Sequence, residues 1–293
     1  MIEELTTEDS KRFPVATICR LVGVSSSGFY DWSGRGPSKR QQTDDQIAEV
    51  IDELRREEGA FFNTYGSPRM HAELRMAKGI HVSRKRVERI MRERGWVGSM
   101  KRKRGWGKAN TATSEDRVNR NFLAAEPNRL WFTDITEHWT KEGKVYCAVV
   151  IDAFSRLAIG WSISSRITAD IVVDALQMAR WRRLGVTGAI MHSDHGSQYT
   201  SWAFTSRVHE AGLLASMGTI GDCYDNAMME SFWSGMQLEL LDSRTWQSKE
   251  ELAAAMFSWI EGWYNPRRRH SSLGYRSPAE YERINTSGTS QAA

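Results

Sequence analysis

The sequence predicts an α/β protein in which a mixed sheet with helices follows a small all-α region. Three observations lead to this prediction. From residue 127 onward, three closely spaced strand patterns precede an alternation of helix and strand patterns. Before residue 99, hydrophobic residues recur only at helical spacing, with glycine or proline between the helices. Residues 69–108, at the junction of the two regions, carry 14 basic and 3 acidic side chains.

Composition and charge exclude several classes of protein. Charged residues make up 26% of the chain and hydrophobic residues 40%, as in globular proteins. No apolar run reaches the length of a membrane span, and the acidic N-terminus does not resemble a secretory signal. Cys19, Cys147 and Cys223 are widely spaced and odd in number, which fits a reducing cytoplasm rather than a disulfide framework. The sequence contains no CxxC or HxxxH pair, so we expect no structural zinc site. We therefore expect a cytoplasmic protein without membrane contact, and the basic segment predicts a polyanionic partner.

Residues 1–40 are predicted to form a first helix-turn-helix-like segment. Apolar residues at helical spacing predict a helix that ends at Gly23, and Ser25 is expected to cap a second, short helix. On pattern alone, a plain two-helix core piece is an equally good interpretation. Residues 33–38 are predicted to be a linker.

Residues 41–98 are predicted to be a helix-turn-helix DNA-binding domain. Ser83 is expected to cap its third helix, which turns its apolar side inward and covers its other faces with arginine and lysine. A basic helical surface of this kind suits binding to duplex DNA. The expected helices are residues 44–56, 68–76 and 84–94. The side chains expected to contact DNA here are Arg69, Arg84, Lys85, Arg86 and Arg89.

Residues 99–126 are predicted to be a basic linker or arm. Lys101, Arg102, Lys103 and Arg104 follow one another and glycine flanks Trp106, so the segment is not a core element. We favour an arm that neutralises DNA phosphates, because the run adjoins a basic helical unit. A solvated basic linker is the alternative interpretation.

Residues 127–285 are predicted to hold the sheet and its helices. The first three strands follow one another closely, which favours an antiparallel meander. The remaining order of helix and strand is typical of helices that cover one sheet. The expected strands are residues 130–139, 145–152, 157–163, 189–192 and 213–216. The expected helices are residues 170–184, 202–211, 226–241 and 250–263. Residues 286–293 are expected to be a disordered tail.

Three acidic residues stand out in this part. Asp134 interrupts an apolar strand, and alternation places it on the same sheet face as Phe132. Asp194 follows a strand end, and Glu230 lies early in a helix, three residues before Trp233. Carboxylates that converge can hold Mg²⁺, and two such ions can drive phosphodiester chemistry. Taken singly, a loop cap would explain Asp194 and a helix N-terminus would explain Glu230. Asp134 is harder to explain, because an unpaired charge in an apolar strand is costly.

Three motifs around these acids resemble a known family. They are Trp-Phe-Thr-Asp-Ile-Thr at residues 131–136, Ser-Asp-His-Gly-Ser-Gln-Tyr at 193–199 and Asp-Asn-Ala-Met-Met-Glu-Ser-Phe at 225–232. Together they resemble the acidic motifs of bacterial insertion-sequence transposases of the OrfB type, which share a retroviral-integrase-like core. As in that family, 35 residues separate the second and third acids. Tyr-Gly-Ser-Pro-Arg at 65–69 and the segment 264–278 extend the resemblance to nearly the whole chain.

The resemblance implies a ribonuclease-H-like core with a five-stranded mixed sheet in residues 127–285. It also implies that Asp134, Asp194 and Glu230 are catalytic ligands of two divalent metal ions. These ions are Mg²⁺, for which Mn²⁺ can substitute. The family frees a 3′-hydroxyl at the end of the element, and this hydroxyl attacks another phosphodiester by direct transesterification. The first attack is typically on the other end of the element, which gives a circular intermediate.

Other residues near the triad have two interpretations each. His195 and Asn226 adjoin the second and third acids, where they either orient the substrate or make loop and cap hydrogen bonds. Arg267, Arg268 and Arg269 form a basic patch that we expect to bind DNA, with a solvated cluster as the alternative.

We therefore expect a DNA transposase that acts on insertion-sequence ends in the bacterial cytoplasm. Its implied partners are duplex DNA at the terminal inverted repeats and at the target, further copies of the chain on that DNA, and an upstream-frame (OrfA-type) helix-turn-helix and coiled-coil product. Two alternatives are a catalytically inert DNA-binding regulator and a ribonuclease-H-type nuclease. The intact acidic triad argues against the first, and the basic helix-turn-helix argues against the second.

Overall fold

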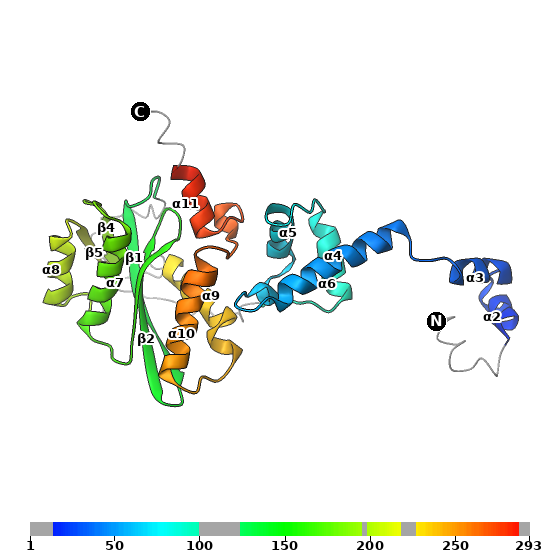
Figure 1. Cartoon of the computed structure of the whole chain (residues 1–293), viewed down its shortest axis with the longest axis horizontal. Coiled ribbons are helices and arrows are strands. Elements are labelled where there is room, and N and C mark those ends of the chain that lie inside the picture. The colour runs from blue at the N-terminus through cyan, green and yellow to red at the C-terminus, as the bar shows by residue number, and fades with distance from the viewer. Residues whose placement is uncertain (1–13, 100–123, 195–197, 218–226, 287–293) are drawn as a thin grey trace, which may run out of the picture. The chain divides into compact units, whose positions relative to one another are not determined.

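The computed structural model describes residues 14–99, 124–194, 198–217 and 227–286 (Figure 1). The chain divides into two compact units, residues 1–50 and residues 51–293. None of the helices within the described ranges is both long enough and apolar enough to cross a bilayer.

The first unit contains two short helices and the beginning of a longer one. These are α2 (Val15–Val22), α3 (Ser26–Ser33) and the N-terminal part of α4 (Lys39–Arg56). Gly23 ends α2 with a φ of 73°, and the Ser25 side chain caps α3 by accepting a hydrogen bond from the amide of Gly28. Both predicted helices are therefore confirmed. Helix α4 begins five residues earlier than predicted, because Ser38 Oγ accepts the amide of Gln41 at 3.2 Å and acts as a cap.

The second unit begins with the rest of α4 and the second helix-turn-helix. The short helix η1 (Phe62–Thr64) precedes α5 (Ser67–Met76) and α6 (Arg84–Glu93). The Ser83 side chain caps α6 as predicted, by accepting a hydrogen bond from the amide of Arg86 at 3.3 Å. Helix α6 buries its apolar side, which confirms the predicted orientation. The buried residues are Val87, Ile90 and Met91.

A mixed five-stranded sheet forms the centre of the second unit (Figure 1). Its spatial order is β3-β2-β1-β4-β5. The first three strands pair antiparallel as a meander, and β4 and β5 add in parallel to β1. This mixed sheet confirms the predicted fold. The strands are β1 (Leu130–Thr140), β2 (Gly143–Asp152), β3 (Ala158–Ser164), β4 (Ile190–Ser193) and β5 (Leu214–Met217).

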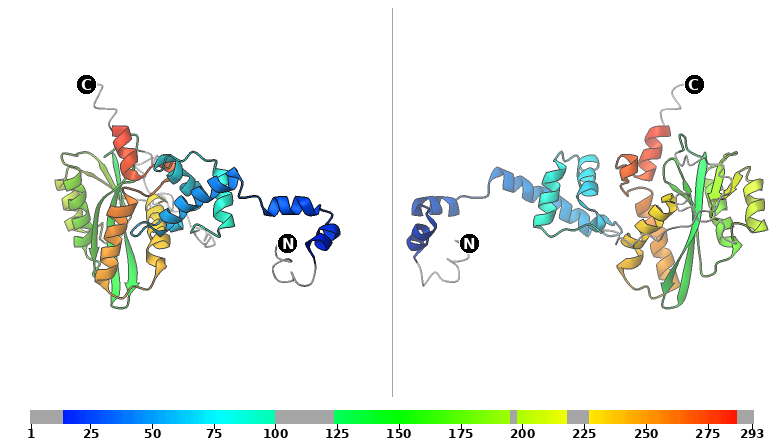
Figure 2. Two further views of the ribbon diagram at one scale, coloured as in Figure 1. Left: turned by 45° about the vertical axis from the view of Figure 1, so that its right-hand side comes forward. Right: turned by 180° about the vertical axis from the view of Figure 1, so that it is seen from behind.

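Helices cover both faces of the sheet (Figures 1 and 2). On one face lie α7 (Ala169–Arg182) and α8 (Trp202–Glu210), and on the other lie α9 (Ala227–Glu239) and α10 (Lys249–Ser258). The first face holds an apolar cluster that includes Trp131 from the sheet and Leu176 from α7. Gly160 allows α7 to approach closely, because a Cβ there would lie 2.1 Å from the carbonyl oxygen of Ala175.

The C-terminal helices differ from the prediction in two ways. The predicted helix at 250–263 ends at Ser258 and continues as a π-helix, η3 (Trp259–Tyr264). The wider turn buries all four large side chains of η3, which accounts for the change in helix type. A last helix, α11 (Pro278–Thr286), was not predicted, because its residues contain too few apolar positions for a periodic pattern. Two further short helices are η2 (Leu241–Ser243) and η4 (Ser271–Leu273).

Candidate active site

The sheet places the first two acids of the predicted triad on two neighbouring strands. Strands β1 and β4 are parallel, with Phe132 opposite His192. Asp134 and Asp194 each follow these paired positions by two residues. Asp134 is half-buried within β1, and Asp194 is exposed just beyond β4. Asp134 therefore lies on β1 beside the point where the shorter β4 ends and Asp194 follows.

The hydroxyl of Tyr199 lies within electrostatic reach of both acids. It is 3.3 Å from Thr133 Oγ1, on the strand that carries Asp134. Burial raises the pKa of Tyr199 well above its usual value, the hydrogen bond with Thr133 opposes this rise, and the negative charges of Asp134 and Asp194 add to it. The charges of both carboxylates therefore act on the buried hydroxyl of Tyr199.

Helix α9 connects Asp134 with the element that carries the third acid. The Trp233 indole Nε1 donates a hydrogen bond to Asp134 Oδ2 at 3.0 Å, and the amide of Ile135 donates to Oδ1 at 2.8 Å. Glu230 lies one helical turn before Trp233, in the first turn of α9, and is exposed. The structure makes Trp233 a half-buried partner of Asp134, a role that its position in the sequence did not predict.

The chemistry of these side chains fits a divalent cation, since carboxylate oxygens are the ligands that Mg²⁺ prefers. Their present arrangement is not a ready-formed metal centre. Within the described ranges, no group of three or more His, Cys, Asp or Glu side chains is positioned to hold a metal ion. The assignment of Asp134, Asp194 and Glu230 as ligands therefore stays a prediction.

Asp152, at the end of β2, has a structural role away from the triad. It is fully buried, and its carboxylate accepts the amides of Asn128 at 2.9 Å and Phe154 at 3.0 Å. Burial raises its pKa, whereas these hydrogen bonds and the positive charge of Arg183 oppose the rise. These contacts fix the turn between β2 and β3.

The expected basic patch at residues 267–269 is not a surface patch, and this part of the prediction is wrong. The side chains of Arg268 and Arg269 are only 7% and 4% exposed. Arg269 forms ion pairs of 2.6 Å with Glu73 and with Glu280. Arg267 is partly exposed, but its guanidinium pairs with a carboxylate of the helical region instead of being free for DNA. Its partner is Glu57, at 2.6 Å.

Glu239 accounts for the burial of Arg268. Its carboxylate accepts a hydrogen bond from Arg268 Nε at 2.9 Å, and others from the indoles of Trp259 at 3.2 Å and Trp263 at 3.0 Å. Burial alone would lower the pKa of Arg268, but the attraction and hydrogen bonds of Glu239 outweigh it and raise the pKa. A second guanidinium, that of Arg69 on α5, lies 3.8 Å from Glu239.

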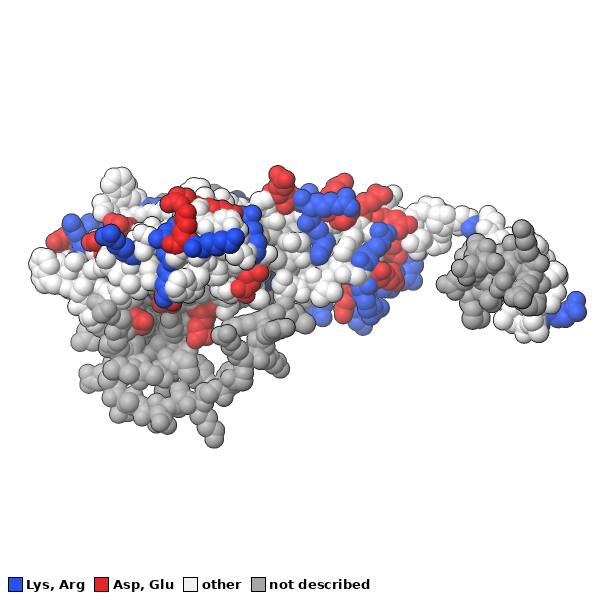
Figure 3. All heavy atoms as spheres, turned by 90° about the horizontal axis from the view of Figure 1, so that it is seen from below, with Lys and Arg blue, Asp and Glu red and all other residues white. Residues whose placement is uncertain are grey.

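The predicted DNA-contacting side chains of α6 are mixed in exposure. Arg84 and Lys85 are exposed and Arg86 is half-buried, whereas Arg89 is paired with Glu93 at 2.9 Å. On the face drawn in Figure 3, basic and acidic side chains are interspersed, and they do not form a continuous basic field. The remaining predicted contacts lie outside the described residues. They are Lys101, Arg102, Lys103, Arg104, His195 and Asn226.

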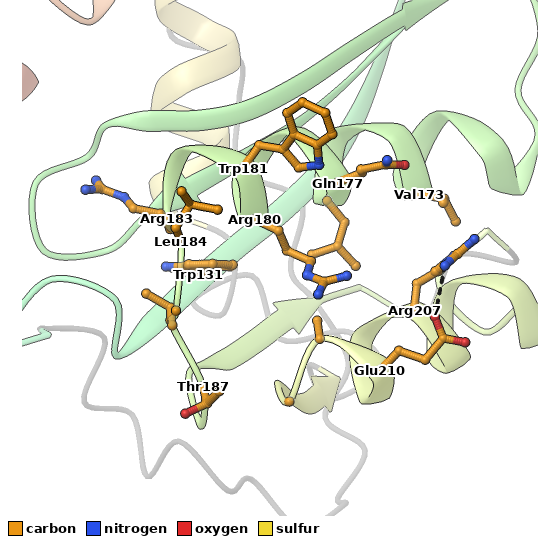
Figure 4. A pocket seen from close by; sticks show the side chains of 15 residues that line it. Trp131, Val173, Gln177, Arg180, Trp181, Arg183, Leu184, Thr187, Arg207 and Glu210 are labelled. Atoms are coloured by element: carbon orange, nitrogen blue, oxygen red, sulfur yellow. Dashed lines mark hydrogen bonds and ion pairs between the residues drawn. The ribbon is translucent and has the colours of Figure 1, made fainter.

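Two of the cavities in the described part of the second unit bear on the location of the site. The larger, of about 510 Å³, lies between α7 and α8, with Trp131 and Leu184 in its wall and the Arg207–Glu210 ion pair at its edge (Figure 4). None of the predicted triad lines it. The smaller, of about 360 Å³, has Glu230 in its wall and is therefore the one next to the candidate site.

The sequence matches three family descriptions that together span most of the chain. Residues 42–104 match an HTH-like domain, and residues 124–223 and 211–278 each match an integrase core domain. These matches cover α5, α6 and the sheet, and they begin after α2 and α3.

Two transposases match this chain over almost its whole length. The transposase InsF for insertion sequence IS3A of Escherichia coli is 38% identical over 281 residues, which cover 93% of this chain and 95% of that protein. The transposase for insertion sequence element IS629 of Shigella sonnei is 36% identical over 284 residues, with 93% of each chain covered. Among solved structures, the HTLV-2 integrase catalytic core in complex with magnesium gives a TM-score of 0.38 at 18% identity, covering 54% of this chain and 97% of that one.

Proposed function

The chain belongs to the family of insertion-sequence transposases with an integrase core domain, and on that premise we propose which side chains carry its chemistry. It is a DNA transposase, an enzyme of the polynucleotidyl transferase class. We propose that Asp134, Asp194 and Glu230 form its active site. We further propose that it cleaves a strand at the 3′ ends of its element and joins those ends to other DNA.

One observation supports this proposal more than any other. Trp233 of α9 donates its indole hydrogen bond to Asp134 of β1, one helical turn from Glu230. Asp134 and Asp194 each stand two residues after Phe132 and His192, which pair across two parallel strands. Three acids that are 35 or more residues apart in the sequence thus belong to elements in contact.

The protein side chains have defined tasks in this reaction. In the first step, water attacks a phosphodiester at the end of the element and its P–O3′ bond breaks, which leaves a 3′-hydroxyl on the element and a 5′-phosphate on the flanking DNA. The second step forms a new phosphodiester from that hydroxyl while another phosphodiester breaks. Asp134, Asp194 and Glu230 would hold two divalent cations, Mg²⁺ or Mn²⁺, which when bound activate the attacking hydroxyl and stabilise the leaving oxygen. Trp233 would keep the Asp134 carboxylate oriented toward this position. Three carboxylates repel one another, and bound cations relieve that repulsion.

The HTH-like domain makes this a DNA-binding protein. We propose that its specific ligands are the terminal inverted repeats and the target duplex, and that Arg84, Lys85 and Arg86 on α6 contact their phosphates. We also propose that copies of the chain assemble on this DNA, with an OrfA-type product as partner, and that the reaction takes place in the bacterial cytoplasm.

Cleavage of labelled terminal-repeat DNA tests the active-site assignment. We expect activity in Mg²⁺ or Mn²⁺ for the native chain and a loss of at least about 1000-fold for Asp134→Ala and Glu230→Ala, comparable with removal of a main transition-state contact. Glu137→Gln is the matched control, because this exposed acid lies on the same strand and pairs with Lys144. If Asp134→Ala cleaves as well as Glu137→Gln, the assignment is wrong.

A further inference from the structure

The smaller cavity is a polar groove beside Glu230. One wall is a single face of α9, on which residues recur at helical spacing. The opposite wall comes from Thr64 and Arg69 near the start of α5 and from Ser99 after α6. The amide of Ser99 donates to the carbonyl oxygen of Thr64 at 2.9 Å, which ties this wall together. The residues of the α9 face are Ala227, Glu230, Ser231, Ser234, Gly235, Leu238 and Glu239.

The groove has more positive than negative charge at its base. Arg69 and Arg268 both line it, and Glu239 is the carboxylate that they share. Arg268 takes the hydrogen bonds, at 2.8 to 3.0 Å. Arg69 stays at 3.8 Å from Glu239, beyond hydrogen-bond distance, and makes no side-chain hydrogen bond to any described residue. At this base, two guanidiniums and one carboxylate sum to +1, and the carboxylate of Glu230 on the wall balances that charge over the whole lining.

Arg69 is held in place although its charge is only partly compensated. Its guanidinium lies 5.6 Å over the ring of Tyr65, and its side chain is 34% exposed. Tyr65 is itself fixed, because its hydroxyl accepts the amide of Arg269 at 2.7 Å and its ring lies 5.5 Å from that of Trp263. Burial lowers the pKa of Arg69, and the neighbouring charge of Arg268 lowers it further. An anion in the groove would oppose this lowering of the pKa, because it favours the charged form of Arg69.

The other polar groups of the groove can donate to such an anion. The hydroxyls of Ser231 and Ser234 make no hydrogen bond to any described residue. Gly235 leaves room for the Arg268 guanidinium to lie against α9, since a Cβ there would be 3.0 Å from Arg268 Nη2. Two hydroxyls and a rigid, undercompensated guanidinium match the oxygens of a phosphodiester.

We propose that this groove binds one backbone phosphate of the DNA strand that Glu230 acts on, with Arg69 as its principal ligand. The proposal rests on the proposed function, because only then does a DNA strand reach Glu230. It gives Arg69 a task apart from reading a DNA groove. Arg69 fixes the strand next to the active site, so that the scissile bond enters in one register.

A phosphate-by-phosphate scan tests this proposal. Terminal-repeat duplexes would each carry one neutral methylphosphonate along the cleaved strand, and binding would be measured by fluorescence anisotropy without divalent metal. For the native chain, we expect one position near the scissile bond to weaken binding about tenfold, the size of one charge-assisted hydrogen bond. For Arg69→Gln, a methylphosphonate at the same position should weaken binding less than about twofold. Methylphosphonates at the other sensitive positions should weaken binding as much as they do for the native chain.

Matched variants keep the test decisive. Arg129→Gln removes an exposed arginine at the opposite end of β1 and should leave the native profile unchanged. Ser231→Asp puts a negative charge in the groove at an exposed site. It should therefore abolish the effect of the methylphosphonate at the same position on binding, and it serves as a second test if Arg69→Gln folds poorly. Identical profiles for the native chain, Arg69→Gln and Ser231→Asp would overturn the proposal. Because this readout needs no metal and no cleavage, it is independent of whether Asp134→Ala proves inactive.

Discussion

The buried carboxylate of Glu239 is predicted to be a main support of the second unit. Glu239→Gln keeps the shape of the side chain but removes the charge that neutralises Arg268. The two side chains are 3% and 7% exposed, so water cannot replace the lost interaction. Two indoles would also lose a charged acceptor, at 3.2 and 3.0 Å.

The expected cost follows from this geometry. Breaking a buried pair by removing one partner leaves an uncompensated charge, which costs about 3–5 kcal/mol. A domain of this kind is stable by only about 5–15 kcal/mol, so the variant should be markedly destabilised. Replacing both partners by apolar residues, in Glu239→Leu with Arg268→Met, removes the stranded charge and should recover most of the loss.

Urea unfolding followed by far-ultraviolet circular dichroism measures these differences. Glu210→Gln is the matched control, because it breaks the ion pair with Arg207 at a site where both side chains are more than half exposed. We expect it to cost less than about 1 kcal/mol. The reasoning would be refuted if Glu239→Gln cost no more than this control, or if the double variant were less stable than the single one.

Two further predictions concern catalysis and pH. Trp233→Phe loses the hydrogen bond to Asp134 and should lower kcat for cleavage about 10- to 100-fold, the range for a hydrogen bond to a charged group. Trp161→Phe, which loses a hydrogen bond to Glu261 instead, should cleave normally, and equal activity of the two variants would contradict the role of Trp233. Burial, and then the charge of Arg268, holds the pKa of His270 well below 6.5, so the folded state keeps it neutral where the unfolded chain takes up a proton. Stability should therefore fall by about 1 kcal/mol from this group between pH 7.5 and 5.5, a loss that urea unfolding of His270→Asn should not show.

Much of the fold was predictable from short-range patterns. The strand alternation around Asp134 assigned its sheet face, and α9 does approach it from that face through Trp233. Ser25 and Ser83 were recognisable as caps, because capping depends on residues three positions away. The parallel addition of β4 to β1 has no local signature, so the register that aligns Asp134 with Asp194 required the structure.

The errors share one physical cause. Three consecutive arginines at 267–269 suggested a solvated or DNA-binding patch, because the sequence near them offers no obvious counter-charge. Their partners lie far away along the chain: Glu239 is 29 residues from Arg268, and Glu73 is 196 residues from Arg269. The role of Trp233 was missed for the same reason, since its acceptor Asp134 is 99 residues away. Long-range pairing of charge is invisible to periodicity.

The number of bound Mn²⁺ ions shows whether the three acids are metal ligands. Electron paramagnetic resonance can titrate Mn²⁺ into the native chain with terminal-repeat DNA, and into Asp134→Asn, Asp194→Asn and Glu230→Gln with the same DNA. We expect two bound ions for the native complex, and at least about tenfold weaker binding of one or both in each variant. Unchanged Mn²⁺ binding in all three variants would contradict the assignment of these acids as the metal ligands of the transposase.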